Sequence, residues 1–234
     1  MARLSLAGWT FGTPRADLIV PPFFALGRTT MRDDQRFSEA IRRIDKANDE
    51  DPRRELVDGT SQPREFLFAR RVYDWVQKLV IEPSEELLLA ARGHTLRRWM
   101  IPRDRYPKTT PGYRQWRQAL AAFHADQAAG ILREVDYSEA TIIRVRALIL
   151  RENWRDDPEG RALEDADCLV FLETKLAGYL DEWEEKKTVN ILKKTLRKMT
   201  PAGKEHAGSL LLSAFGSAGP MRAPTTTLWP LAFS

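Results

Sequence analysis

Apolar residues recur every three or four positions along most of this chain, which is the spacing of one face of an α-helix. The first such stripe consists of Phe37, Ala40, Ile41, Ile44 and Ala47. It stops at the Asp51-Pro52 pair, where a proline disfavours helical backbone at the residue before it. The pattern therefore predicts a first helix that ends before residue 51.

Helix-start signals precede the later apolar stripes. Pro63 suits a first helical turn, Ser84 and Ser138 can cap N-termini, and the Thr110-Pro111 and Asp157-Pro158 pairs begin two further helices. The helix after Ser84 is predicted to run through LLLAARGHTLRRW until Pro102, whereas PRRELVDGTSQ is predicted to be a linker. TVNILKKTLRKM predicts a seventh helix, and Pro201 begins a short one.

No segment shows the alternation of apolar and polar residues that a half-buried strand requires, and no internal repeat is present. The sequence predicts an all-α fold, a single multi-helix domain of about seven helices. We expect this domain to span residues 31–215. Residues 1–30 are poor in acids and interrupted by prolines, so they predict either a mitochondrial leader or a disordered segment. Residues 216–234 predict an unstructured tail.

Composition narrows the class of protein. No apolar run approaches the roughly 20 residues of a membrane span, which predicts a soluble protein with no membrane partner. The single cysteine, Cys168, excludes an internal disulfide and a cysteine-based zinc site, so a reducing, cytoplasmic location is expected unless the N-terminus is a mitochondrial leader. A net charge of +4 favours anionic partners.

The positive charge is concentrated in residues 92–124, which hold only one acid, Asp104, and have a histidine near each end. The basic residues are Arg92, Arg97, Arg98, Arg103, Arg105, Lys108, Arg114 and Arg117, interleaved with Trp99, Tyr106, Tyr113 and Trp116. Arginines hold phosphate through paired hydrogen bonds, and aromatic rings stack on bases. The segment therefore predicts a phosphate-binding region.

His94, Arg97 and Arg98 would share one helical face, since they lie at positions i, i+3 and i+4. Arg103 and Arg117 flank the same loop, so a bound phosphate is expected to meet several arginines at once. The alternative is that Arg97 and Arg98 are solvated and His94 is a hydrogen-bonded helix residue.

His124 and the acids of LEDADCLVFLE are candidates for buried chemistry. His124 lies on a semi-apolar face, and a half-buried imidazole needs a backbone carbonyl, a carboxylate or a metal as its partner. At least one of Glu164, Asp165 and Asp167 must approach the core, where a metal, an arginine such as Arg70 or Arg71, or a helix N-terminus would compensate its charge.

Seven separated blocks, in order, resemble the family catalogued as domain of unknown function family 4202. They cover about residues 34–208 and read RFSEAIRRIDKANDEDP, FLFARRVYDW, HTLRRWMIPRDRYP, GYRQWR, FHADQAAGILREV, LEDADCLVFLE and LRKMTPAG. Some fungal members carry the label glutamyl-tRNA synthetase. A class I synthetase needs a Rossmann-type sheet, however, and this chain has no parallel-strand pattern.

The order of polar residues is also similar to that of the helical HD phosphohydrolases, named for a paired histidine and aspartate that bind a metal. This more distant resemblance implies an HD-like helical bundle in which His94, His124 and a late aspartate, either Asp165 or Asp167, hold a divalent ion. The form LED favours Asp165. Thr95 stands where the paired aspartate is expected, which weakens the implied metal site.

Two functions stay open. In the first, a metal on His94, His124 and Asp165 activates water while Arg71, Arg97 and Arg98 hold a phosphorylated metabolite or nucleotide. In the second, the basic and aromatic face from residue 92 to 117 binds RNA or a nucleotide without catalysis, with Trp99 among the stacking rings. The enzyme requires the histidines and the aspartate around one pocket, whereas RNA binding requires a broad open face.

Overall fold

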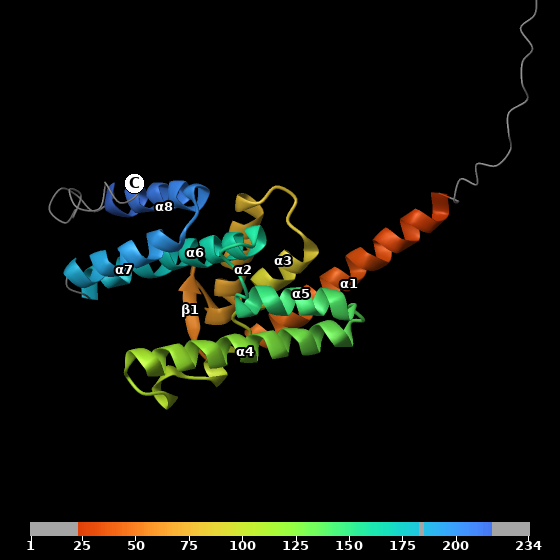
Figure 1. Ribbon diagram of the computed structural model, residues 1–234, viewed down its shortest axis with the longest axis horizontal. Helices are drawn as coiled ribbons and strands as arrows, with labels where there is room; N and C mark the ends of the chain where they lie inside the picture. The colour runs from red at the N-terminus through yellow and green to blue at the C-terminus, as the bar shows by residue number, and fades with distance from the viewer. Residues whose placement is uncertain (1–22, 183–184, 217–234) are drawn as a thin grey trace, which may run out of the picture. The chain divides into compact units, whose positions relative to one another are not determined.

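The computed structural model describes residues 23–182 and 185–216 (Figure 1). The chain forms two compact units, residues 1–35 and 36–234. The described part of the first unit is the beginning of helix α1 (Phe23–Asp49), so residues 23–30 of the predicted leader are helical. The rest of that leader, and the predicted tail from residue 217 onward, lie outside the described residues.

The second unit confirms the all-α fold class. After α1 come strands β1 (Arg54–Val57) and β2 (Thr60–Pro63), then helices α2 (Arg64–Leu79) and α3 (Glu85–Gly93). Two short 3-10 helices follow, η1 (Arg98–Met100) and η2 (Arg103–Arg105). The remaining helices are α4 (Thr110–Glu134), α5 (Glu139–Leu150), α6 (Pro158–Glu182), α7 (Glu185–Lys198) and α8 (Pro201–Gly216).

Hydroxyl side chains begin three of these helices. Ser84 accepts a hydrogen bond from the Leu87 amide at 3.0 Å, and Ser138 accepts one from Thr141 at 3.2 Å. Helix α4 is capped by Thr109, whose hydroxyl accepts from the amide of Gly112 at 3.2 Å, one residue before the predicted Thr110. Each cap satisfies an amide that has no partner inside the helix.

The predicted linker between the first two helices is wrong, because it forms an antiparallel hairpin. Strands β1 and β2 pair Arg54 with Pro63 and Val57 with Thr60. Asp58 and Gly59 both adopt positive φ, 49° and 76°, as a two-residue hairpin turn requires. The hairpin lacks alternating apolar residues and is largely exposed, so only its Asp-Gly turn signals it in the sequence.

Helix α3 ends earlier than predicted. It stops at Gly93, and Arg97 has a φ of 54°, which is outside the helical region. The Asn48 side chain holds this turn by accepting a hydrogen bond from the Arg97 amide at 3.1 Å. The prediction that His94, Arg97 and Arg98 share one helical face is therefore wrong.

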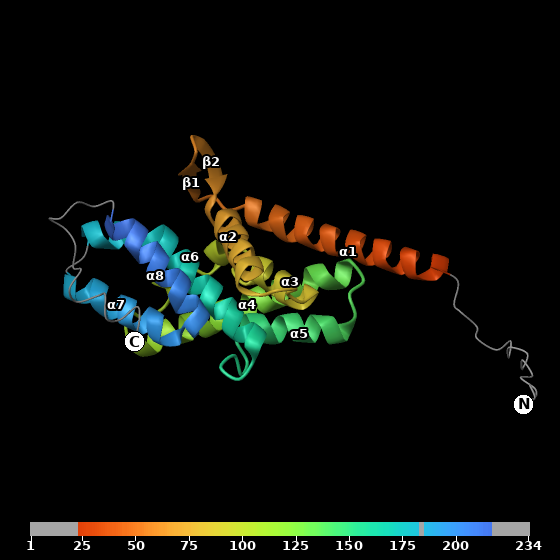
Figure 2. The ribbon, with the colours of Figure 1, turned by 90° about the horizontal axis from the view of Figure 1, so that it is seen from above.

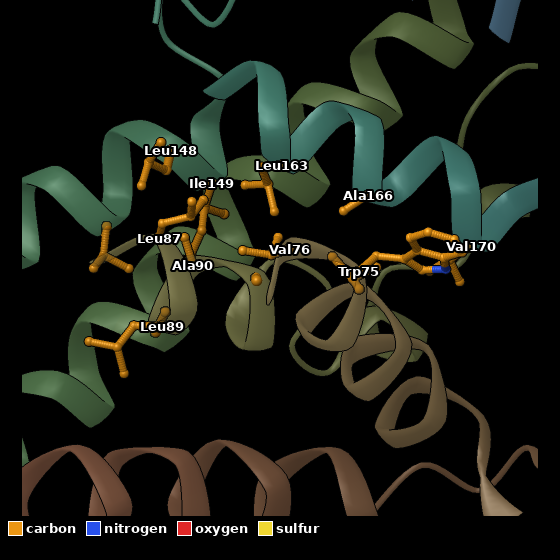
Figure 3. Close-up of a cluster of buried hydrophobic side chains, with 14 of the residues drawn as sticks. Trp75, Val76, Leu87, Leu89, Ala90, Leu148, Ile149, Leu163, Ala166 and Val170 are labelled. Atoms are coloured by element: carbon orange, nitrogen blue, oxygen red, sulfur yellow. The ribbon is translucent and has the colours of Figure 1, made fainter. Parts of the chain in front are cut away.

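The hydrophobic core lies where α2, α3, α5 and α6 meet. Figure 3 shows Val76 of α2, Leu87 of α3, Ile149 of α5 and Leu163 of α6 pointing toward one another. Helix α6 also packs on α7 and α8, and α4 packs on α5 (Figure 2). A Cβ added at Gly93 would lie 3.4 Å from the Cβ of Ala128, so the end of α3 approaches α4 closely. This approach brings the turn after α3 against α4.

Candidate functional site

A cavity of about 340 Å³ opens between α2, the turn before η1, and helices α4, α6 and α7. Its volume lies within the range of small-molecule sites, roughly 300 to 1,000 Å³. Five basic side chains line its wall together with three acids and two phenylalanines. These residues are Arg64, Arg71, Arg98, Arg117 and Lys198; Glu55, Glu65 and Asp167; and Phe68 and Phe171.

A recess of about 30 Å³ adjoins this cavity and shares four wall residues with it, namely Thr95, Arg98, Arg117 and Asp167. Its other polar wall residues are His94, His124 and Arg151. The volume suits roughly one water molecule or one hydroxyl group. The structure thus brings together both predicted histidines, two of the predicted arginines and the less favoured aspartate.

His94 lies at the C-terminal end of α3 and is almost fully buried. Its Nδ1 is 2.9 Å from the carbonyl oxygen of Ala91. A carbonyl can only accept, so Nδ1 carries the proton and donates. The opposite nitrogen, Nε2, lies 3.5 Å from a carboxylate oxygen of Asp167. The backbone thereby orients His94 toward the aspartate.

His124, in the middle of α4, is held in the same way. Its Nδ1 donates to the carbonyl of Leu96 at 2.7 Å, while Nε2 is buried and has no hydrogen-bond partner among the described residues. Burial lowers the pKa of His124 to about 3, with the charges of Arg98 and Arg117 acting in the same direction. His124 is therefore neutral at physiological pH, and its bare Nε2 can only accept a hydrogen bond.

Asp167 of α6 is the carboxylate of the recess. Burial would raise the pKa of Asp167, but the charge of Arg151 and the contact with His94 outweigh it and hold the pKa well below its usual range. Arg151 donates to Asp167 at 2.7 Å and also pairs with Glu164. Asp167 is therefore ionised and already paired with one cation.

Arg98 and Arg117 are half-buried and reach both the cavity and the recess. Among the described residues, neither guanidinium forms a hydrogen bond or ion pair with a protein acceptor. Burial lowers the pKa of Arg98, and the neighbouring charge of Arg117 adds to this effect, while Glu65 and Asp167 oppose it from a distance. Arg98 also lies 5.1 Å from the ring centre of Trp116.

Thr95 completes the wall. It occupies the turn between α3 and η1 and is 3% exposed. Its hydroxyl oxygen is buried and has no hydrogen-bond partner in the described part of the chain. An unsatisfied buried hydroxyl is costly, so a ligand group that bonds to it would be favoured.

Several predicted binding residues are engaged elsewhere. Arg71 lines the cavity but donates to Glu55 at 3.0 Å. Arg97 reaches Glu50 and Gln127, each at 3.0 Å, and Arg103 donates to two backbone carbonyls of its own loop at 2.8 Å. Trp99 is half-buried and lines neither space. The arginine cluster of the sequence is therefore split among separate partners.

Asp165, which the sequence reasoning favoured, does not line either space. Successive helical residues turn by about 100°, so Asp165 and Asp167 lie on nearly opposite sides of α6. The Asp165 carboxylate accepts a hydrogen bond from the Thr200 amide at 3.0 Å and another from the Thr200 hydroxyl. A Cβ added at Gly203 would lie 2.5 Å from this carboxyl group. Asp165 thus stabilises the beginning of α8 through hydrogen bonds from Thr200.

Comparisons with known proteins identify the family. The family model described as a domain of unknown function (DUF4202) matches residues 38–217. This chain belongs to that family. No curated protein and no solved structure matches it. The helices that the structure describes all lack the combination of length and apolar character that a membrane-spanning helix needs.

The side chains present do not fit the divalent ion that the HD resemblance implies. Among the described residues, no group of three or more histidines, cysteines or acids is arranged to hold a metal. Asp165 is turned away, and Asp167 is bound by Arg151. Arg98, Arg117 and Arg151 also line the recess, and their charges repel a cation.

Sequence reasoning missed Arg151 and Thr95 as wall residues of the recess. Arg151 follows the apolar run of α5 and adopts a φ of 61°, a backbone conformation that the sequence does not reveal. Thr95 was noted only as a departure from the HD pattern. For Arg151 the signal is the change from apolar to polar residues at the end of a predicted helix, whereas Thr95 lies inside a predicted helix and no local pattern marks it.

Proposed function

We propose that this protein binds a phosphorylated small molecule or nucleotide in the cavity, with the phosphate held by Arg98 and Arg117. The observation that carries the proposal is the pair of half-buried guanidinium groups that lack a protein acceptor in the described chain. Their mutual repulsion would be relieved by an anion between them. Phosphate oxygens match the planar donor fork of arginine better than a monatomic anion does.

The other charges of the wall support an anionic ligand. Each acid already has an arginine partner, since Glu55 binds Arg71, Glu65 binds Arg53 and Asp167 binds Arg151. The wall therefore has no unpaired carboxylate to compete with phosphate for Arg98 and Arg117. Phe68 and Phe171 offer apolar surface for the rest of the ligand.

The distribution of contacts favours a small ligand over RNA. Arg92 is buried against Asp45, and Arg97 and Arg103 have the partners described above. The indole nitrogen of Trp116 donates to the carbonyl of Ile101 at 2.9 Å. An RNA face needs arginines and rings that are free to meet the backbone and stack on bases. Arg92 and Arg97 instead bind Asp45, Glu50 and Gln127 outside residues 92–124, and Arg103 and Trp116 bond to backbone carbonyls within that segment.

Replacing Arg98 by Lys provides the test of binding. The substitution keeps the charge but removes the planar fork. It should therefore reduce the binding free energy of a phosphorylated ligand by roughly 1.5 to 3 kcal/mol, the value of a lost charged hydrogen bond. The measurement is isothermal titration with a panel of nucleotides and sugar phosphates and their unphosphorylated counterparts. Arg117→Lys should behave similarly.

Arg103→Lys is the matched control, because Arg103 lies in the same segment but lines neither space. It should leave affinity unchanged. Equal affinities for wild type and both cavity variants, or no preference for the phosphorylated compounds, would refute the proposal. Binding of RNA oligonucleotides that depends on salt but not on Arg98 would favour the open-face alternative.

Hydrolysis of the bound phosphate ester is a second candidate function, favoured by the unprotonated Nε2 of His124 beside a recess that suits about one water. An anionic ester bound beside the ring would raise the low pKa of His124 toward that of an effective general base. In such a reaction the water oxygen bonds to phosphorus, its proton passes to Nε2, and the ester P–O bond breaks. The departing oxygen takes a proton from solvent in the cavity, while Arg98 and Arg117 neutralise the charge that develops.

Phosphate release from the same panel, measured with and without a chelator, tests this chemistry. Release that survives chelation and is lost in His124→Asn supports the histidine as a general base. That substitution retains a donor near the Leu96 carbonyl but removes Nε2. If the wild type binds the ligand but releases no phosphate, the protein is a binding protein and not a hydrolase. Phosphate release that requires an added metal would contradict the mechanism.

A further inference from the structure

We infer that His124 makes this anion site selective for phosphate that carries a proton, so that it discriminates against sulfate. The inference rests on the proposed phosphate site and adds the feature by which the ligand is recognised. It concerns the recess, whose wall combines two arginines with buried groups that accept hydrogen bonds. A ligand oxygen entering this space must satisfy both kinds of group.

The orientation of His124 establishes the acceptor. Its Nδ1 proton is committed to the Leu96 carbonyl at 2.7 Å, so the nitrogen on the other side of the ring is unprotonated. Nε2 is buried with no partner in the described chain, and the residue is only 2% exposed. A ligand hydroxyl can donate to this nitrogen, whereas a bare anionic oxygen would meet its lone pair and be repelled.

The other polar groups of the recess wall also fit a ligand that both donates and accepts hydrogen bonds. Asp167 adds a negative carboxylate, and Arg151 and His94 already contact that carboxylate. Thr95 adapts to either role, because its hydroxyl can donate or accept. Arg98 and Arg117 supply the donors for the unprotonated oxygens of the ligand. The arrangement therefore fits an oxyanion with both bare oxygens and one hydroxyl.

Hydrogen phosphate has this combination of groups and sulfate lacks it. At about pH 8, above its second pKa and well below its third, inorganic phosphate is mainly a dianion that still holds one proton. Sulfate has the same charge and nearly the same size but no proton. For an organic phosphate, the same bond requires a protonated phosphate oxygen or a neighbouring hydroxyl. The recess volume of about 30 Å³ admits one such group.

The test is titration of the full-length protein with inorganic phosphate and with sulfate at about pH 8 and constant ionic strength. Wild type should bind phosphate about tenfold or more tightly, because sulfate loses one hydrogen bond and gains a repulsion. His124→Asn should reduce the ratio of phosphate affinity to sulfate affinity toward one, mainly by weakening the binding of phosphate. His206→Asn is the control, since His206 packs on Trp75 and lines neither space.

Each outcome decides between the hypotheses. Equal affinities of wild type for the two anions, both weakened by Arg98→Lys, would overturn the selectivity while leaving the anion site intact. If wild type binds neither inorganic phosphate nor sulfate, the phosphate site itself is overturned. A preference for phosphate that persists in His124→Asn would assign selectivity to another group. The wild-type comparison requires no variant, so it remains decisive if His124→Asn does not fold.

Discussion

The backbone sets the chemistry of the two buried histidines. The carbonyls of Ala91 and Leu96 each accept the Nδ1 proton, which leaves both Nε2 atoms facing away from their backbone partners. His94 then meets Asp167, whereas His124 has no protein partner for Nε2 in the described chain. Two identical side chains therefore acquire different roles. Burial, reinforced by the charges of Arg98 and Arg117, lowers the pKa of His124 and makes its neutral form the stable one.

Stability should fall below about pH 6.5 because of His124. The pKa of His124 is about 3 when folded and 6.5 as the ordinary value, so the unfolded chain binds the proton first as the pH falls. The contribution is therefore fully present above the unfolded pKa and declines below it. Between about pH 6.5 and pH 5 it amounts to about 1.5 kcal/mol.

Urea denaturation at these two pH values measures this dependence. His124→Asn should show a smaller loss of stability than wild type over the same interval, even though the variant starts from a lower stability. His206→Asn serves as the reference for a histidine outside the recess. A pH dependence unchanged in His124→Asn would show that other groups cause it.

At the scale of elements, helix α6 separates two aspartates that are neighbours in sequence. Asp167 faces the recess and pairs with Arg151, and Asp165 faces the beginning of α8 and binds Thr200. Gly203 leaves room for Asp165, because a Cβ at residue 203 would lie 2.5 Å from the carboxyl group and force it to shift. One helix thus contributes to the candidate site on one side and to the packing of α8 on the other.

Asp165→Ala should destabilise the protein without affecting ligand binding. It removes the acceptor for the Thr200 amide, and the loss should resemble that of a helix cap, about 1 to 2 kcal/mol. Urea denaturation measures the loss, and titration with the phosphorylated ligand should give wild-type affinity. Asp167→Asn is the comparison, since it alters the recess. If Asp165→Ala loses affinity for the ligand and Asp167→Asn does not, Asp165 belongs to the binding site after all.

At the scale of the whole second unit, the cavity depends on segments that are far apart in sequence. The turn at Thr95, the beginning of α4 at Arg117 and the middle of α6 at Asp167 form one wall. They meet because the core of α2, α3, α5 and α6 places α3 close to α4 and packs α2 against α6. A ligand that contacts all three segments would stabilise them together.

Hydrogen exchange should reveal this coupling. A saturating phosphorylated ligand should slow amide exchange simultaneously in peptides that cover residues 95–98, 113–117 and 167–171, because one ligand joins them. Peptides from residues 201–213 of α8 line neither space and provide the internal reference. Protection limited to the exposed loop at residues 100–108 would instead indicate surface binding.

Local patterns were sufficient for most helices and for the candidate side chains. Caps at Ser84 and Ser138 and the Asp157-Pro158 pair predicted helix starts correctly, because these signals act within one helical turn. His94, His124, Arg98 and Arg117 were all chosen from the sequence, and all line the recess. The hairpin was missed because it buries few apolar residues, so the sequence lacks the alternation of apolar and polar residues that would predict its strands.

The sequence by itself determined the all-α class, the family, and the supply of histidines and arginines, because helical periodicity and residue type are local properties. Tertiary structure decided which of them meet. The Asn48 side chain ends the helical path before Arg97, so Arg97 turns toward Glu50 while Arg98 enters the recess. The rotation of α6 selects Asp167 over Asp165, and Arg151 reaches it from another helix end. Such choices depend on contacts across many residues, where burial and charge balance outweigh any local pattern.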